Sequence, residues 1–528
     1  MREEIKNKEV KLRRTHGITL IALVITIVVL LILAAVSIAT LTGQNGILTR
    51  ADEASEQTKQ KTAEEKVAVE VLGSYGEDGN IDYDLLNKNL QNVEGLTEGL
   101  PISKLPATVV VDGYDVTINA DGSVTARDSN PGGGETGKTD GSYDTAEGVN
   151  TPKLKDNMKL VVYDNGNWVE DTTKSAYKYE AQTGATPNGG TSEWANAELE
   201  GNYYVWIPRY AYKIDKNTSY TSQSGISYKI DIKFLIGTTN QYYGDDGELK
   251  NAEIPTNADE IISSTDTYYV HPAFTFGTQN LEGLWIGKYE SSDAGNEEIA
   301  IVPNVTSLTN INVSTMFSRA QTLSKTNIDA HMLKNTEWGA VAYLTQSQYG
   351  RNGTEVSVNQ CSDYITGVGR GIGTGTDNPI WNSIYSIDGI TQKQRYDGEI
   401  GKLSSTTGNV YGIYDMSGGA YEYVMGVYGT NNSPIIGSSG FTEFPEGKYY
   451  NLYTTTSANN SNIGDALYET SGWNNDYVNF VNFVNSEKSF FARGGSYNYT
   501  DNDGIFIFSR DNGRSVSNNT FRVSLVIN

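Results

Sequence analysis

The stretch Asn409–Val424 of this chain reads NVYGIYDMSGGAYEYV, and the stretch Phe491–Tyr497 reads FARGGSY. Both combine closely spaced aromatic residues with paired glycines. Large rings are typical of core anchors and glycines of tight turns, so most of these positions are predicted to serve folding. After Asn150, short runs rich in Tyr, Val, Ile and Trp alternate with long Gly, Asn and Ser segments. This pattern predicts a loop-rich domain with limited regular structure.

Three further segments accompany these two along the chain: LWIGKYE at Leu284–Glu290, NTEWGAVAYL at Asn335–Leu344 and FRVSL at Phe521–Leu525. In this order, the five segments resemble the formylglycine-generating-enzyme or sulfatase-modifying-factor family over roughly residues 200–528. The resemblance implies that family's variant of the C-type lectin fold. It also implies a ligand face built from the C-terminal loops.

Catalytic residues of that family are missing from the sequence. Its oxidase members bind copper through a pair of cysteines after the Arg-Gly-Gly-Ser motif, whereas Ser496–Asn519 contains no cysteine. Relatives that use iron carry a histidine set, but His16, His271 and His331 are scattered along this chain. We therefore expect that the protein is not an enzyme. A sulfatase-modifying-factor-type enzyme is the alternative.

The segment Tyr497–Asn519 mixes Tyr, Asn, Ser and Asp, the residue types of recognition loops. Contact with a protein or glycan ligand is predicted for Tyr497, Tyr499, Asp501, Asn502, Asp503, Ile505, Asp511 and Asn512. The segment resembles the variable region of C-type-lectin-fold proteins diversified by retroelements, which also follows an Arg-Gly-Gly-Ser motif and ends in Phe-Arg-Val. The alternative is that these residues are ordinary polar surface loops.

Calcium is the one cofactor that the family resemblance implies. In that family, backbone oxygens near a Ser-Gly-Asn segment and a following glutamate hold a calcium ion. Gly418, Ala420 and Glu422 match those positions, and oxygen ligands are what calcium takes. Gly419 stands where the family carries asparagine, so the site is expected to be weakened or lost.

The N-terminal segment joins a basic leader to an apolar run. Ile18–Leu41 contains no charged residue over roughly 24 positions, which is long enough to cross a bilayer as a helix. The basic flank is expected to stay in the cytoplasm. A secretory signal peptide would have a shorter apolar core. We therefore predict a single-pass membrane protein with extracellular C-terminal domains, at the cell surface or on a pilus.

The junction Gly17-Ile18 resembles the processing site of type IV prepilins and pseudopilins, where a prepilin peptidase cuts after the glycine. The resemblance implies the membrane and this peptidase as partners, with other pilin subunits as further candidates. Ala22 stands where the family usually carries a glutamate linked to subunit registration in the filament. Polymerisation is therefore left open, and a plain single-pass anchor is the alternative.

These expectations define an α+β fold class: a long N-terminal membrane-spanning pilin-like helix with a small β-containing domain, then a loop-rich C-type-lectin-like domain. The predicted boundaries are a leader at 1–17, a transmembrane and amphipathic stalk helix at 18–75, a pilin-like α/β head at 76–128, a Gly-rich linker at 129–150 and the lectin-like domain at 151–528. Within the head, Ile81–Asn89 is predicted as a short helix and Ala107–Ile118 as a hairpin that turns at Asp112-Gly113.

Composition narrows the function further. The net charge of −24 argues against nucleic acid, because phosphate binding needs clustered Lys and Arg. The single cysteine, Cys361, excludes an internal disulfide. The predicted function is a membrane-anchored, pilin-like surface protein that displays a non-catalytic ligand-binding domain for adhesion or recognition. A minor pilin whose head serves only assembly is a third possibility.

Overall fold

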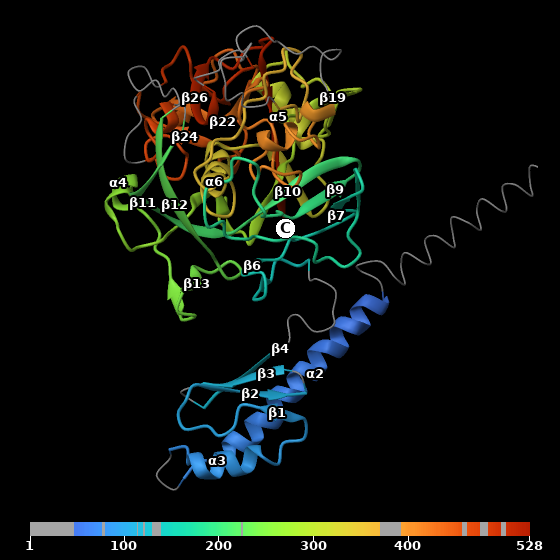
Figure 1. Cartoon of the computed structure of the whole chain (residues 1–528), viewed down its shortest axis with the longest axis vertical. Coiled ribbons are helices and arrows are strands. Elements are labelled where there is room, and N and C mark those ends of the chain that lie inside the picture. The colour runs from blue at the N-terminus through green and yellow to red at the C-terminus, as the bar shows by residue number, and fades with distance from the viewer. Residues whose placement is uncertain are drawn as a thin grey trace, which may run out of the picture. The chain divides into compact units, whose positions relative to one another are not determined.

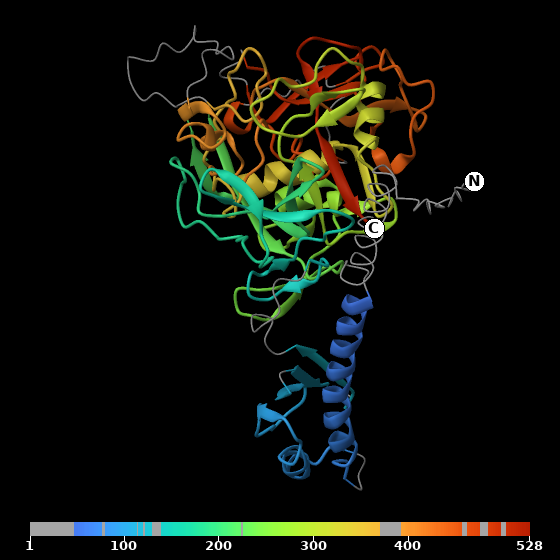
Figure 2. The same cartoon turned by 90° about the vertical axis from the view of Figure 1, so that its right-hand side faces the viewer.

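The computed structural model describes residues 47–76, 80–112, 114–119, 122–128, 139–222, 225–369, 392–456, 462–475, 484–497 and 503–528. The chain divides into two compact units, Met1–Gly133 and Gly134–Asn528 (Figures 1 and 2). Each unit has its own hydrophobic core.

The first unit packs helices against an antiparallel sheet of order β1-β2-β3-β4 (Figure 1). Helix α2 (Ile47–Leu72) buries Ala63, Val67 and Val71, which recur every four residues and therefore lie on one face. Helix α3 (Tyr83–Leu90) begins after Asp82, whose carboxylate accepts hydrogen bonds from two backbone N–H groups of the first turn. The strands are β1 (Leu96–Glu98), β2 (Ala107–Val111), β3 (Tyr114–Ile118) and β4 (Val124–Asp128).

The predicted fold class is wrong, and so is the predicted localisation as a single-pass membrane protein. The described residues form mostly β-sheets with few helices, and no helix among them is both long enough and apolar enough to span a bilayer. Helix α2 is long, but Lys61, Glu65 and Lys66 interrupt its apolar residues, and its apolar face packs on the small sheet instead. The predicted span Ile18–Leu41 and the processing residues Gly17 and Ile18 lie outside the described residues.

Regular helices are short in the second unit. They are α4 (Ala258–Ser263), α5 (Val313–Gln321) and α6 (Asn335–Gln346), with 3-10 turns η1 (Pro272–Phe274), η3 (Gln392–Gln394), η4 (Gly401–Ser404), η5 (Gly447–Tyr449) and η6 (Trp473–Asn475). Helix α6 is buried along nearly its whole length, and the Glu337 carboxylate accepts the Lys334 backbone N–H at 2.8 Å to cap its first turn.

The largest sheet of the second unit has seven strands in the order β21-β28-β18-β10-β9-β7-β8. Their bounds are β21 (Ile328–Met332), β28 (Val523–Ile527), β18 (Gly283–Gly287), β10 (Asn202–Pro208), β9 (Asn196–Leu199), β7 (Lys159–Asp164) and β8 (Asn167–Glu170). Antiparallel pairing sets Trp285 of β18 opposite Leu525 of β28. Strand β28 therefore lies between β21 and β18, which are both formed by residues much earlier in the sequence.

Several smaller sheets surround this one. Their strands are β11 (Tyr210–Thr221), β12 (Ile226–Phe234) and β15 (Tyr269–Val270) in one sheet, and the pairs β5 (Tyr143–Asp144) with β6 (Val149–Asn150), β13 (Gln241–Tyr243) with β14 (Leu249–Asn251), β16 (Thr275–Phe276) with β17 (Gln279–Asn280), and β19 (Ser292–Gly295) with β20 (Glu298–Ala300). The pair β5–β6 falls inside the stretch predicted as a linker.

A six-stranded sheet built around β22 (Tyr421–Thr430) carries the C-terminal loops. Its other strands are β23 (Ser433–Pro434), β24 (Asn451–Tyr453), β25 (Phe490–Gly494), β26 (Gly504–Asp511) and β27 (Asn519–Phe521). Strand β22 is buried over most of its length because β25 pairs with it antiparallel while β24 and β27 pair with it in parallel. The indole N–H of Trp338 in α6 donates to the Ile505 carbonyl at 2.7 Å and ties β26 to the core.

Candidate functional site

Most of the described residues predicted to contact a ligand lie on β26 and the loop that follows it. Tyr497, Asp511 and Asn512 are half-buried, whereas the side chains of Asp503 and Ile505 are buried. The Asp503 carboxylate accepts a hydrogen bond from the Ser496 backbone N–H at 2.8 Å, which is a contact within the fold. Tyr499, Asp501 and Asn502 lie outside the described residues. Among the described candidates, Tyr497, Asp511 and Asn512 are thus the ones whose side chains are partly exposed.

The loop Asn512–Asn518, here called the recognition loop, is held by its backbone. Backbone carbonyls of the loop accept hydrogen bonds from neighbouring segments: Asn512 from Ser438 at 2.9 Å, Gly513 from Val313 at 3.0 Å, Val516 from Asn310 at 2.9 Å and Asn518 from Tyr421 at 2.9 Å. The Asn512 side chain also accepts the Arg514 backbone N–H at 3.2 Å. The path of the loop is thus fixed by main-chain contacts and one short turn.

Side chains of the recognition loop point outward from this fixed path. Arg514 is 61% exposed, and Ser515 and Ser517 are exposed as well. The guanidinium of Arg514 lies 3.8 Å from the Asp511 carboxylate, an exposed ion pair that contributes little to stability. These side chains can therefore make contacts outside the molecule without the loop first having to become ordered.

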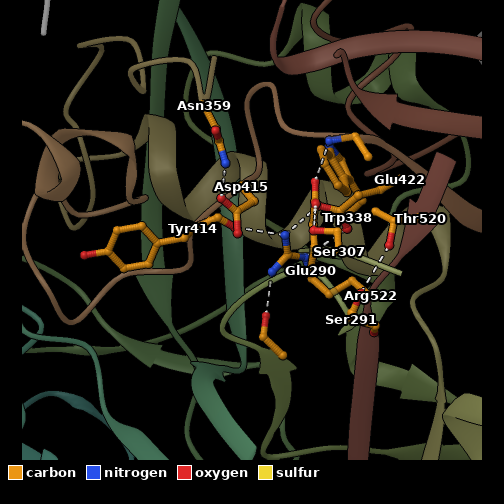
Figure 3. Close-up of polar contacts among 12 residues, drawn as sticks. Glu290, Ser291, Ser307, Trp338, Asn359, Tyr414, Asp415, Glu422, Thr520 and Arg522 are labelled. Carbon is orange, nitrogen blue, oxygen red and sulfur yellow. Dashed lines mark hydrogen bonds and ion pairs between the residues drawn. The ribbon is translucent and has the colours of Figure 1, made fainter. Parts of the chain in front are cut away.

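A few residues beyond the recognition loop in the chain, Arg522, which joins β27 to β28, forms a buried ion pair with Glu422 of β22 (Figure 3). The Arg522 Nε–H donates to one Glu422 oxygen at 3.0 Å and an Nη2–H donates to the other. One Nη1–H donates to the Gly287 carbonyl and one Nη2–H to the Tyr414 carbonyl, each at 2.8 Å. Arg522 therefore links the six-stranded sheet to the seven-stranded sheet.

Two more buried carboxyls, Glu290 and Asp415, lie beside this pair (Figure 3). Asp415 accepts hydrogen bonds from the Asn359 side chain at 2.9 Å and from the Gly367 backbone N–H at 2.9 Å. Glu290 accepts the Ala420 backbone N–H at 3.1 Å. Burial raises the pKa of both carboxyls, and their mutual repulsion raises the pKa of Glu290 further.

The Ser307 hydroxyl lies against the Glu290 carboxyl and affects its pKa. The Ser307 hydroxyl makes a short contact with Glu290 Oε2 and also lies 3.0 Å from the Tyr364 carbonyl oxygen. A hydroxyl has one hydrogen to donate. The hydrogen bond that Ser307 donates to Glu290 lowers the pKa of this carboxyl, but burial and the nearby Asp415 and Glu422 raise it more, so the pKa of Glu290 stays well above its ordinary value.

Stability is expected to depend on the Glu290 proton. Because the pKa of Glu290 is higher in the folded state than its ordinary 4.5, the folded state keeps this proton longer than the unfolded chain. The free energy of unfolding should then fall as pH rises from about 4.5 through the folded pKa. Glu290→Gln, which mimics the protonated carboxyl, should reduce this fall, measured by urea denaturation at pH 5, 7 and 9. The exposed Glu170→Gln is the control, and identical profiles for wild type and Glu290→Gln would refute the assignment.

The calcium site implied by the resemblance does not fit the geometry of its glutamate. Both oxygens of Glu422 accept hydrogen bonds from Arg522, so a calcium ion there would face a guanidinium cation. The backbone N–H of Gly418 donates to the Gly494 carbonyl, and that of Ala420 donates to Glu290. Within the described ranges, no group of three or more His, Cys, Asp or Glu side chains could hold a metal ion. We therefore derive no role for calcium through Glu422.

The two histidines that the structure describes occupy separate buried environments. His271 lies among the rings of Tyr210, Tyr212 and Tyr343, and burial lowers its pKa to about 3. The Nε2 of His331 lies 3.1 Å from the Glu337 carboxylate. Each histidine thus packs within the core.

Sequence reasoning missed the buried charges as a group. Glu290, Asp415, Glu422 and Arg522 were each visible inside an aromatic-rich motif, in KYE, YDM, YEY and FRV. A charged residue flanked by large apolar residues in several motifs is a signal for a buried ionic network, because a lone buried charge is costly. Only the folded chain shows that the motifs meet.

The second unit is therefore a mostly β, loop-rich domain that has a backbone-held polar loop and a buried ionic network. No protein-family model matches the chain, and no curated protein matches it. Among solved structures, it is similar to a protein described as Major Tropism Determinant M1 Variant, with 14% sequence identity over 82% of this chain and 84% of that chain and a TM-score of 0.23. Likeness at this level does not assign the chain to a family.

Proposed function

We propose that the second unit is a non-catalytic recognition domain that binds a protein or glycan partner through the recognition loop. One observation carries this proposal: main-chain hydrogen bonds from Asn310, Val313, Tyr421 and Ser438 fix the loop, while its side chains stay exposed. Preorganised loops lose little conformational entropy on binding, so their contacts contribute more fully to affinity. The exposed side chains, Arg514, Ser515 and Ser517, are also of residue types that are common in recognition loops.

This geometry also supports the idea that the segment is diversified by a retroelement. Because backbone groups hold the recognition loop, exposed residues such as Arg514, Ser515 and Ser517 can change without moving the main chain. A genetic observation tests the idea: a nearby repeat of the coding segment that differs from it mainly at adenines. Without such a repeat, the loop is a fixed binding surface.

The enzymatic alternative is less well supported. Ser496–Asn519 contains no cysteine, and Cys361 is buried in the core. Burial raises the pKa of the Cys361 thiol, which disfavours the reactive thiolate. We therefore propose recognition, for adhesion or partner selection, as the function of this face.

Changing the exposed side chains of the recognition loop should weaken binding and leave the fold intact. In the Arg514→Ala, Ser515→Ala and Ser517→Ala triple variant, we expect binding to fall at least about tenfold, since hot-spot side chains each contribute about 2 kcal/mol or more. An array of purified cell-surface proteins and glycans, probed with the whole protein, measures this loss. The thermal transition should stay unchanged because the loop is held by its backbone.

A matched control is available on β11, where Lys216, Asn217 and Ser219 are exposed at the irregularity in its pairing with β12. Alanine at these three positions should leave the array pattern as it is in the wild type. Equal binding by the recognition-loop variant and the wild type would contradict the proposed function.

A further inference from the structure

Tyr364 holds a backbone conformation that tyrosine rarely adopts. Its φ is 52°, in the left-handed region where residues other than glycine are strained. The surrounding structure enforces this conformation: the Tyr364 backbone N–H donates to the Cys361 carbonyl at 3.0 Å, and the Ser307 backbone N–H donates to the Tyr364 carbonyl at 2.9 Å. Glycine would fit this turn without strain, so the tyrosine side chain calls for another explanation.

The ring of Tyr364 meets the ring of Tyr497 at the surface. The ring centroids are 5.4 Å apart and the planes are inclined by 74°, an edge-to-face contact that leaves a corner between two half-buried rings. The Tyr497 backbone N–H donates to the Gly419 carbonyl at 2.9 Å, which fixes this second ring. Within the described part of the chain, neither phenol hydroxyl makes a hydrogen bond to another residue.

This aromatic corner lies directly beside the recognition loop. Gly419 receives the hydrogen bond from Tyr497, and Tyr421, two residues further on, donates to Asn518 at the end of the loop. On the other side, Ser307 contacts Tyr364 while Asn310 contacts Val516. Two short segments therefore connect the corner to the loop, so that a ligand could contact both.

We propose that Tyr364 is a fixed member of the contact face and that the partner is a protein, which packs a side chain into the corner between Tyr364 and Tyr497. This inference rests on the proposed recognition function. A half-buried tyrosine offers apolar ring area and a hydroxyl, and such residues are enriched at protein interfaces. A flat sugar ring would be served better by one open ring face than by two rings inclined at 74°.

The left-handed backbone at Tyr364 provides a test with separable effects on folding and binding. Tyr364→Gly removes the backbone strain and also the ring contact, and these two changes oppose each other in stability. We expect the thermal midpoint of this variant to stay within about 3 °C of the wild type. Partner binding should nevertheless fall, because the wall of the corner is gone.

The experiment pans a library of random twelve-residue peptides displayed on phage against the whole wild-type protein. Peptides enriched over a no-protein control then serve as probes for purified variants. We expect at least tenfold weaker binding to Tyr364→Gly and to Tyr497→Ala. Two matched controls should bind as the wild type does: Lys174→Gly, which relieves a φ of 53°, and Tyr243→Ala, which removes a 41% exposed ring from another surface.

Each other outcome overturns part of the proposal. Peptides that bind Tyr364→Gly as tightly as the wild type would exclude Tyr364 from the face, while the recognition-loop variant separately tests the proposed function. A library that yields no enriched peptide would argue against a protein partner. A glycan array hit that depends on Tyr364 would assign the corner to sugar instead.

Discussion

Glu422→Ala is expected to lower the free energy of unfolding by about 3–5 kcal/mol, because it leaves the Arg522 guanidinium buried without its counter-charge. Both side chains are fully buried, so water does not replace the lost carboxylate. Arg522 also joins the two sheets, because it contacts Glu422 of β22 and the Gly287 carbonyl of β18, so losing the Glu422 carboxylate should loosen this link. Urea denaturation at pH 7 measures the change.

The control for this variant is Glu170→Ala, which removes one partner of the exposed Lys159–Glu170 pair and should cost no more than about 1 kcal/mol. A loss at Glu422 as small as that at Glu170 would show that the buried pair is not needed. Calcium provides a second check: added calcium or chelator should not shift the wild-type midpoint. A calcium-dependent midpoint that disappears in Glu422→Ala would restore the metal interpretation of this glutamate.

Gly339→Ala should destabilise the protein by about 3 kcal/mol, even though alanine is the better helix former by roughly 0.5–1 kcal/mol. Gly339 lies within α6, and a Cβ there would be only 2.0 Å from the Gly464 carbonyl oxygen and 3.0 Å from the Asp465 Cα. These are backbone atoms, which cannot relieve the clash by a change of rotamer as a flexible side chain can. The helix would have to move away from the 464–465 segment.

Thermal and urea unfolding of Gly339→Ala should be compared with Gly184→Ala, where a Cβ meets nothing within 4 Å. The Gly184 variant is expected to be neutral or slightly stabilised, since alanine restricts the unfolded chain. If Gly339→Ala proved as stable as the wild type, the close approach of α6 to the 464–465 segment would be refuted.

Local signals in the sequence located several elements well. The stretch predicted as an amphipathic helix after Arg50 is α2, because apolar residues recur on one face. The predicted hairpin around Asp112-Gly113 is β2–β3, and Asp112 has the positive φ of 54° that such a turn requires. These features depend on neighbours in the sequence and can be read from them.

Contacts between distant segments could not be predicted in this way. Strand β28 pairs with β18 across most of the second unit, and no periodicity in Phe521–Leu525 specifies that partner. The left-handed conformation of Tyr364 is equally hidden, because Tyr364 accepts a hydrogen bond from the Ser307 backbone and donates one to the Cys361 carbonyl. The fold class was wrong for a different reason: an apolar run led to the prediction of a membrane helix, whereas the regular structure of the described chain consists mostly of β-strands.

The support of the recognition loop has a consequence for when the surface comes into existence. Its carbonyls are held by Asn310, Val313, Tyr421 and Ser438, which come from parts of the chain that approach one another only in the assembled domain. Contacts of such long sequence separation form late in folding. A nascent or partly unfolded chain therefore lacks the ordered loop through which we propose that the partner binds. The ordered recognition loop is thus present only in the fully folded domain.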